Sequence, residues 1–404
     1  MDIFTFQHVP ADNTYGNGKI VNGLRSKLWV ERYDTPGEFK LVGQPTTPLR
    51  EQLAIGTLLS HTNTGQVMIV EDHEIIDDTE NGSEFIVTGR SLDSFLEHRP
   101  STDDDMGFDP YPLYDGTAWP VGHQFGETTP PELLVKLISA MLVAPEDDMG
   151  RPEFAIPDLN VAHTITATYT PKIQDVQRGE LASEVYRILD EIGAGIRVER
   201  PNQAHDNMKM VIHKGVNRRK SVRLSWDHGD IVKARYFWSQ RGHRNATYIS
   251  NNYQGLYVRL GSAEGETGLH LGVSYEDATD LRQAQSFAEV LKIYSIMETR
   301  AKRLLRRRKH RAIMEATVAS TGRYRYRKHY NVGDIIFVDG NYGVSGTFRV
   351  TEFAETDDEN GQFGHPTLES VKIIDPDDDD PNAVDIYETE VARELGPSEE
   401  DVPG

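Results

Sequence analysis

The sequence contains no cysteine among its 404 residues. This absence excludes disulfide bonds, thiolate metal sites and a cysteine nucleophile. No apolar run approaches the roughly 18 residues that a membrane-spanning helix needs. Residues 1–20 also lack the apolar segment beside basic residues that marks a secretory signal peptide. The missing cysteine fits a reducing site of synthesis, and we expect no stable membrane insertion.

Motifs that carry catalytic chemistry are also missing. There is no His-Glu-x-x-His helix, no Gly-x-Ser-x-Gly elbow, and no pair of histidines at metal-ligand spacing. His73 lies in an alternating segment that reads as a strand, so a structural role is expected for it. We predict no catalytic residue, no metal site and no cofactor. A carboxylate pair for glycoside hydrolysis depends on the fold rather than on spacing, so a cell-wall hydrolase stays open as an alternative.

The charge is acidic and unevenly placed. The net charge is −21, and residues 375–404 hold twelve acidic residues and one arginine, which contributes −11. Such a segment is usually solvated and mobile, although it could also dock on a basic partner surface. We delimit an acidic tail at 376–404. A second acidic cluster, Asp103 to Asp109, lacks the ligand spacing of a calcium loop, so a solvated loop is expected, with an adventitious cation site as the alternative.

Residues 1–99 read as a first β domain of the barrel type. Alternating residues at 27–33 and 38–42 flank Pro36-Gly37, which predicts a hairpin. A second pair, 66–71 and 84–88, has Asn81-Gly82 between its strands. Ser91 then precedes a short helix as its expected N-cap.

The middle of the chain alternates between loop and helix signals. Residues 100–131 are rich in Pro, Gly, Asp and Tyr, which indicates a long loop or linker. In 132–225 we expect an α/β domain, with a helix capped by Thr129-Pro130-Pro131-Glu132. A second helix begins near Gly179-Glu180, has its apolar stripe at 181–192 and ends at Gly193, before a strand at 194–199.

Strand signals return in the last part of the chain. Residues 226–317 read as a β segment, with strands from 221 to 260, followed by a long helix at about 276–316. A C-terminal β domain is expected at 318–375, with strands at 324–329, 334–339, 346–353 and 367–374.

A basic run closes the expected long helix. Eight lysine and arginine residues lie between Arg300 and Arg311. They complement the dipole at a helix C-terminus, and they could also bind phosphates. Because no aromatic residues are interleaved and the protein is acidic, a solvated or subunit-contacting face is favoured over nucleic-acid contact. The candidate subunit contacts are Arg303, Arg306, Arg307 and Arg311.

Several segments together resemble one protein family. These are 26–42, 68–75, 87–99, 181–185 with 193–198, and 330–338 with 348–352. They are similar, in the same order, to the tail-hub or tail-associated (Tal) proteins of siphophages that infect actinobacteria. The motif residues are Trp29, Arg32, Tyr33, Gly37, Gly89, Arg90, Leu92, Gly333 and Asp334.

The resemblance implies a mixed α+β, β-rich, multidomain fold like that of a phage baseplate hub. Such a hub has two tube-type β-barrel domains plus an α/β domain, and three copies form a pseudo-sixfold ring that continues the tail tube. The expected partners are two further copies of the chain, the distal tail protein, the tape measure protein and other tail-tip proteins, with transient passage of phage DNA. The location that the resemblance implies is the distal end of the virion tail, after synthesis in the host cytoplasm. A carbohydrate-binding adhesin of the tail tip is a further alternative, which exposed Trp and Tyr on one sheet face would favour.

Overall fold

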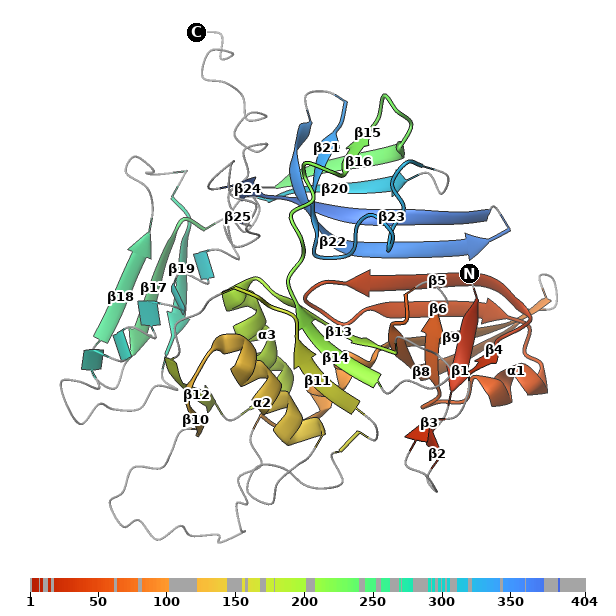
Figure 1. Ribbon diagram of the computed structural model, residues 1–404, viewed down its shortest axis with the longest axis horizontal. Helices are drawn as coiled ribbons and strands as arrows, with labels where there is room; N and C mark the ends of the chain where they lie inside the picture. The colour runs from red at the N-terminus through yellow and green to blue at the C-terminus, as the bar shows by residue number, and fades with distance from the viewer. Residues whose placement is uncertain are drawn as a thin grey trace, which may run out of the picture. The chain divides into compact units, whose positions relative to one another are not determined.

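A computed structural model shows the chain as a β-rich protein with a few helices (Figure 1). The residues that the structure describes are 2–6, 8–9, 14–15, 18–61, 64–78, 82–101, 122–143, 155–156, 159–167, 172–177, 179–200, 208–239, 244–251, 256–261, 269, 271–278, ten helical positions between 290 and 305, 311–318, 322–341, 344–359, 361–373 and 384–385. Within them, no helix is both long and apolar enough to cross a membrane.

The N-terminal β region forms the two predicted hairpins. The hairpin of β5 and β6 pairs Trp29 with Phe39, and that of β8 and β9 runs from Met68 opposite Ser91 to Asp78 opposite Gly82. Both hairpins are confirmed. The elements of this region are β1 (Ile3–Phe6), β2 (His8–Val9), β3 (Thr14–Tyr15), β4 (Lys19–Ile20), β5 (Leu24–Arg32), β6 (Glu38–Gly43), α1 (Thr47–Gln52), β7 (Leu58–His61), β8 (Val67–Asp78), β9 (Gly82–Ser91) and the 3-10 helix η1 (Leu92–His98).

The C-terminal β region joins the same sheet as the N-terminal one. β22 pairs antiparallel with β5, so that Thr356 lies opposite Leu28 and Glu352 opposite Arg32 (Figure 1). The sheet has 13 strands in the order β16-β20-β23-β22-β5-β6-β9-β8-β7-β1-β4, with β15 and β21 attached beside β22. Its remaining strands are β15 (Arg223–Ser225), β16 (Ile231–Ser239), β20 (Arg311–Val318), β21 (Ile335–Asp339), β22 (Ser345–Asp358) and β23 (Gly361–Ser370).

The strand order of the large sheet bears directly on whether the chain forms the two β-barrels that were expected. Its path is open, from β16 at one end to β4 at the other, and the described strands form no closed barrel. The two β regions share one sheet because the 14-residue β22 offers a long edge, and pairing with β5 satisfies the backbone groups of that edge. A β-rich fold is confirmed, whereas two separate barrels are not.

The α/β part is built around two amphipathic helices. α2 (Pro130–Leu142) begins as predicted, with the Glu132 carboxylate accepting a hydrogen bond from the Thr129 backbone N–H at 3.1 Å. α3 (Leu181–Ile192) ends at Gly193, whose φ of 62° is left-handed, as glycine allows. The strands here are β10 (Gly122–Thr128), β11 (Leu159–His163), β12 (Lys172–Gln177), β13 (Gly195–Glu199) and β14 (Met208–His213). β10 lies in the segment expected to be all loop, whose residues 102–121 fall outside the described ones.

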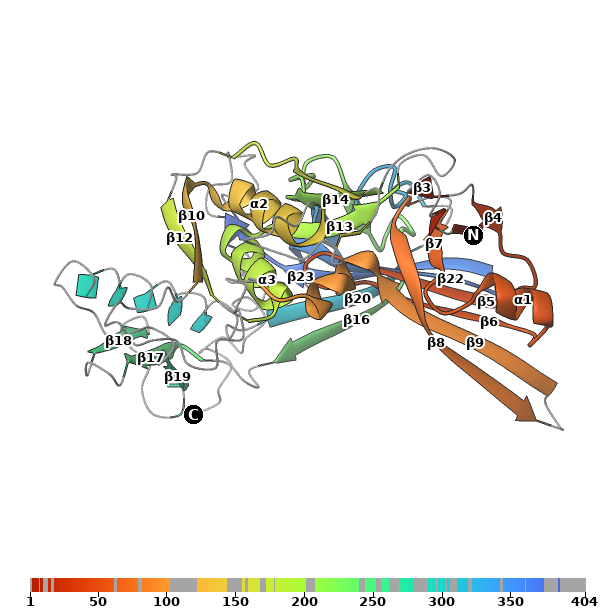
Figure 2. The same cartoon turned by 90° about the horizontal axis from the view of Figure 1, so that it is seen from below.

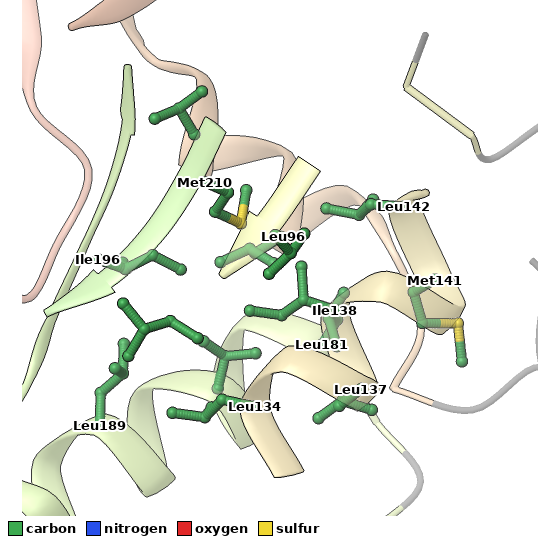
Figure 3. Close-up of a cluster of buried hydrophobic side chains, with 14 of the residues drawn as sticks. Leu96, Leu134, Leu137, Ile138, Met141, Leu142, Leu181, Leu189, Ile196 and Met210 are labelled. Atoms are coloured by element: carbon green, nitrogen blue, oxygen red, sulfur yellow. The ribbon is translucent and has the colours of Figure 1, made fainter. Parts of the chain in front are cut away.

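The two helices bury their apolar faces against the β11-β14-β13 sheet. Figure 3 shows Leu134 and Ile138 of α2 beside Leu189 of α3, with Ile196 and Met210 reaching in from the strands. Leu96 of η1 enters the same cluster, as does Leu92. The first β region and the α/β part are therefore joined by a common hydrophobic core.

A separate small module contains β17 (Ala246–Asn251), β18 (Leu256–Gly261) and β19 (Val273–Asp277), in the order β18-β17-β19. Ile249 of this sheet packs with Ile293, Met297 and Ala301, which occupy helical positions. By its contacts the chain divides into two compact units: residues 1–234, 315–337 and 349–368 form one, and 235–314, 338–348 and 369–404 form the other. The module belongs to the second unit.

Three local predictions were wrong. The long helix does not continue to 316, because Arg311–Val318 is strand β20, which pairs in the large sheet. Residues 324–329 form a turn rather than a strand, closed by a hydrogen bond from the Arg327 N–H to the Tyr330 carbonyl at 2.8 Å. Ser91 precedes η1 but makes no side-chain cap there, because its hydroxyl accepts the Gly37 N–H at 2.8 Å.

The acidic tail falls almost wholly outside the described residues. Its exception is β25 (Val384–Asp385), which pairs with β24 (Lys372–Ile373). Asp103 to Asp109 also lie outside them.

Candidate functional site: the junction at Tyr33 and Glu31

The N-terminal β region, the α/β part and the C-terminal β region of the first unit meet at the end of β5 and the residue that follows it. Alternation along β5 places Trp29, Glu31 and Tyr33 on one face, and all three side chains are buried. Trp29 packs in the core of the N-terminal region, stacked on Phe39 at 6.0 Å between ring centroids. Glu31 and Tyr33, further along, contact the C-terminal β region and the α/β part. A single strand thus positions a core residue and two joining residues.

Tyr33 ties together backbone from distant segments. Its hydroxyl donates to the Gly193 carbonyl at 2.9 Å and accepts from the Gly215 N–H at 3.3 Å. Its own N–H donates to the Thr351 carbonyl at 3.0 Å, and its carbonyl accepts from the Ile196 N–H at 3.2 Å. Burial raises the pKa of the phenol. The side chain is therefore a neutral hydrogen-bonding group that fixes the end of α3 and the end of β14 against β5.

Glycines make room for the Tyr33 ring. A Cβ on Gly195 would lie 2.3 Å from the Tyr33 carbonyl oxygen, and one on Gly333 would lie 2.3 Å from the ring carbon Cε2. A Cβ on Gly215 would lie 1.7 Å from the carbonyl oxygen of Gly333. These contacts are closer than carbon atoms allow, so each position requires glycine unless the backbone moves. The Arg349 guanidinium lies 5.1 Å from the centroid of the ring.

Asp334 holds the loop between β14 and β15. Its carboxylate accepts the Val216 N–H at 2.7 Å, the Arg218 Nε–H at 2.7 Å and the Asn331 N–H at 2.9 Å. Three charge-assisted bonds to one buried carboxylate fix a loop strongly. Gly333 and Asp334, which were singled out as motif residues, therefore meet Tyr33 and its neighbours at one place.

A buried ion pair lies beside this contact. The Glu31 carboxylate accepts hydrogen bonds from the Tyr326 hydroxyl at 2.5 Å and from the Arg327 guanidinium. Tyr326 stacks flat on Phe353 of β22, with 3.8 Å between the ring centroids. Arg327 has a φ of 65°, which is uncommon for a residue with a side chain. The turn at 326–330 thus presents two donors to one carboxylate of β5.

The ion pair borders a small polar pocket. Gln66 and His213 line it together with Glu31 and Arg327. Burial lowers the pKa of His213 to about 3, so this ring is uncharged at neutral pH. Among the described residues, no group of three or more His, Asp or Glu side chains is placed to hold a metal ion. The arrangement joins segments of the chain through hydrogen bonds and ion pairs.

The remaining motif residues lie away from the junction or at its rim. Arg32 binds Glu352 through Nε and Glu38 through Nη2, both at 2.7 Å, and so links β5 to β22 and β6. Gly37 lies directly before β6, where a Cβ would lie 2.3 Å from the Val30 carbonyl oxygen, and Gly89 lies within β9, where a Cβ would lie 1.9 Å from the Ile69 carbonyl oxygen.

The structure does not test the four candidate subunit contacts. Arg303, Arg306 and Arg307 lie outside the described residues, and Arg311 is the first residue of β20 rather than part of a helix. Their proposed role stays a prediction.

Arg90 forms a surface ion-pair network. Its guanidinium binds both oxygens of Glu71 at 2.9 Å and Glu97 at 2.6 Å, which ties η1 to β8. These carboxylates raise the pKa of Arg90. Arg90 therefore connects β9 to β8 and η1 through ion pairs.

We predict that Arg90→Ala lowers the free energy of unfolding by about 1 kcal/mol, since the pairs are partly exposed. Arg90→Lys should recover less than half of this loss, because an ammonium cannot bind Glu71 with two parallel bonds. Urea unfolding followed by circular dichroism measures both variants. Unfolding curves identical to the wild-type curve would contradict the prediction.

Sequence reasoning missed Glu31, Tyr326, Arg327 and the glycines at 195 and 215. A signal existed for Glu31, because alternation puts this carboxylate on the same face as Trp29. No signal existed for Arg327, whose segment reads as an alternating strand. Pairings over 160 to 296 residues of sequence separation are set by tertiary structure.

Comparison with known proteins shows which family and which solved structures this chain is similar to. Residues 11–368 match the family described as Siphovirus ReqiPepy6 Gp37-like protein. No curated protein matches the chain. Among solved structures, the 43 kDa tail protein of prophage MuSo2 from Shewanella oneidensis is similar, with a TM-score of 0.56 and 13% identity over 91% of this chain and 98% of that one.

Two further tail proteins share the fold. One is from Neisseria meningitidis MC58, with a TM-score of 0.53 and 13% identity over 95% of this chain and 99% of that one. The other is prophage tail protein gp18 from Listeria monocytogenes EGD-e, with a TM-score of 0.52 and 10% identity over 91% and 94%. The family match covers most of the chain, junction included, and so the protein belongs to the Gp37-like family of siphovirus tail proteins.

Proposed function

We propose that this tail protein is the hub of the siphovirus tail tip, a structural component rather than an enzyme. In this role three copies form a pseudo-sixfold ring at the distal end of the tail. The ring continues or closes the tail tube, lets phage DNA pass at ejection, and anchors the distal tail, tape measure and other tip proteins. The nine motif residues act as structural joints within each copy.

The open edge of the large sheet is the observation that carries this proposal. β16 is the last strand of the sheet, and no described strand pairs with its outer edge. Val232 is 59% exposed and Phe237 is 48% exposed on this strand. Long edge strands with exposed apolar side chains pair readily with another chain. Ring formation through this edge would complete its backbone hydrogen bonds and cover its apolar residues.

A ring of this kind also needs domains that do not shift within each copy. The Tyr33 contacts, the Glu31–Arg327 pair and the β22–β5 pairing tie the N-terminal, α/β and C-terminal parts of the first unit together. Two tube-type barrels per copy, formed once neighbouring sheets pair, are part of the proposal. An acidic or neutral lumen is a further part, because a basic wall would retain DNA phosphates.

Native mass spectrometry of the purified chain tests the proposal. We expect a trimer at micromolar concentration, and a monomer for the double variant V232E/F237E, because charges on an edge strand block pairing. Ile55→Glu is the matched control, since Ile55 is 65% exposed but lies outside β16. A wild-type monomer, or a trimer that survives the double variant, would contradict ring formation through this edge.

A further inference from the structure

The small β18-β17-β19 sheet has two chemically different faces. One face is covered: Thr247, Ile249 and Asn251 are fully buried, and Ile249 packs on the helical positions Ile293 and Met297. The helical residues lie along this side of the sheet (Figure 2). Because strand side chains alternate, the residues between the buried ones form the opposite face.

The opposite face gathers tyrosines from all three strands. Tyr257 of β18 is 68% exposed and Tyr275 of β19 is 64% exposed. Tyr248 of the central strand lies directly opposite both Tyr275 and Arg259 in the strand register. The Arg259 guanidinium lies 5.6 Å from the centroid of the Tyr248 ring. The strand register therefore places the three tyrosines and Arg259 on one face of the sheet, which we name the tyrosine face.

The part of the tyrosine face that lies on the described strands is small for a protein partner. Three strands of about five residues cover roughly 10 Å by 17 Å, on the order of 200 Å². A stable protein interface buries about 800 Å² on each partner. A ligand of a few sugar rings matches the smaller area.

The charged residues of the tyrosine face indicate which class of small ligand it suits. Its described charged residues are Arg259 and Asp277, which balance. The chain as a whole carries −21, which disfavours a phosphate polymer. Tyrosine offers an apolar ring together with a polar hydroxyl, and so suits a ligand with apolar C–H faces and hydroxyl edges.

We propose that the tyrosine face binds a neutral oligosaccharide of pyranose rings. The C–H faces of the sugars stack on Tyr257 and Tyr275, while Arg259 and the phenol hydroxyls bond to the sugar hydroxyls. This is a binding activity beyond assembly of a tail-tip hub, and it holds whether or not the chain forms a ring.

The test is binding of the full-length chain to an immobilised panel of short hexose and N-acetylhexosamine oligosaccharides, followed by calorimetric titration of the strongest binder. We expect Tyr257→Ala and Tyr275→Ala each to weaken binding about tenfold, and the double variant to abolish it. Tyr257→Phe should change affinity less than about threefold, because the ring is kept. Phe363→Ala is the matched control, since this 37% exposed aromatic lies in β23 and should leave affinity unchanged.

Three outcomes would overturn the proposal. The first is that no oligosaccharide of the panel binds the wild-type chain. The second is that binding survives the double variant, whose melting temperature should match that of the wild type because both side chains are exposed. The third is that the double variant loses a tail-protein partner while no sugar binds, which would make the face a protein contact. Oligomer mass is read separately, so failure of the hub proposal is distinguishable from failure of this one.

Discussion

Replacing Arg327 with methionine should lower the free energy of unfolding by about 3–5 kcal/mol. Glu31 is only 4% exposed, and its carboxylate accepts from Arg327 and Tyr326. Removing the guanidinium leaves a carboxylate buried without its counter-ion, and that desolvation cost is no longer offset. Methionine keeps much of the side-chain volume, so the loss reports charge rather than a cavity. Urea unfolding at pH 7 measures the change.

A matched surface pair separates burial from charge pairing. Arg25 binds Glu84 at 3.0 Å, with both side chains 41% exposed. We expect Arg25→Met to cost less than about 1 kcal/mol, because exposed pairs contribute little. The double variant E31Q/R327M should be more stable than Arg327→Met alone, since it removes the unpaired charge. Equal losses for Arg327→Met and Arg25→Met would contradict a buried, coupled pair.

The sequence predicted local elements better than long-range contacts. The hairpins of β5–β6 and β8–β9 were predictable from alternation around Pro36-Gly37 and Asn81-Gly82, and α3 from its apolar stripe and Gly193. The turn at 326–330 was not, because its tyrosines alternate as in a strand while the Arg327–Tyr330 hydrogen bond closes a turn. Strand β20 was hidden in the same way, since its alanines and methionine also suit a helix.

The candidate site shows the same difference between signals within one segment and contacts between distant segments. Tyr33, Gly333 and Asp334 carried a signal through the family resemblance, and the structure brings them together. The pairing of β22 with β5 carried no sequence signal, because an alternating pattern determines which face of a strand is buried but not which strand pairs with it. For that reason two separate β domains were expected where one sheet connects both regions.

Substitution of Gly333 is the second change that we expect to lower the stability of the protein strongly. We expect Gly333→Ala to lower the free energy of unfolding by at least about 3 kcal/mol, or to prevent folding. Two causes add at this position. Its φ of 93° is one that residues with a side chain rarely adopt, and a Cβ would lie 2.3 Å from the Tyr33 ring.

A second glycine isolates the packing contribution. Gly56 has a φ of 84°, but a Cβ there meets no atom within 4 Å. Gly56→Ala should therefore show the backbone cost alone, about 1–2 kcal/mol. The excess loss in Gly333→Ala then measures the close contact with Tyr33. The single variant Tyr33→Ala should lose more stability in the wild-type background than the same substitution does in the Gly333→Ala background, because there it also removes the close contact. Thermal and urea unfolding of the four variants gives the values. If the two glycine variants lose equal stability, the Tyr33 contact is not tight, and the junction would tolerate the movement between its three parts that the proposed hub must prevent.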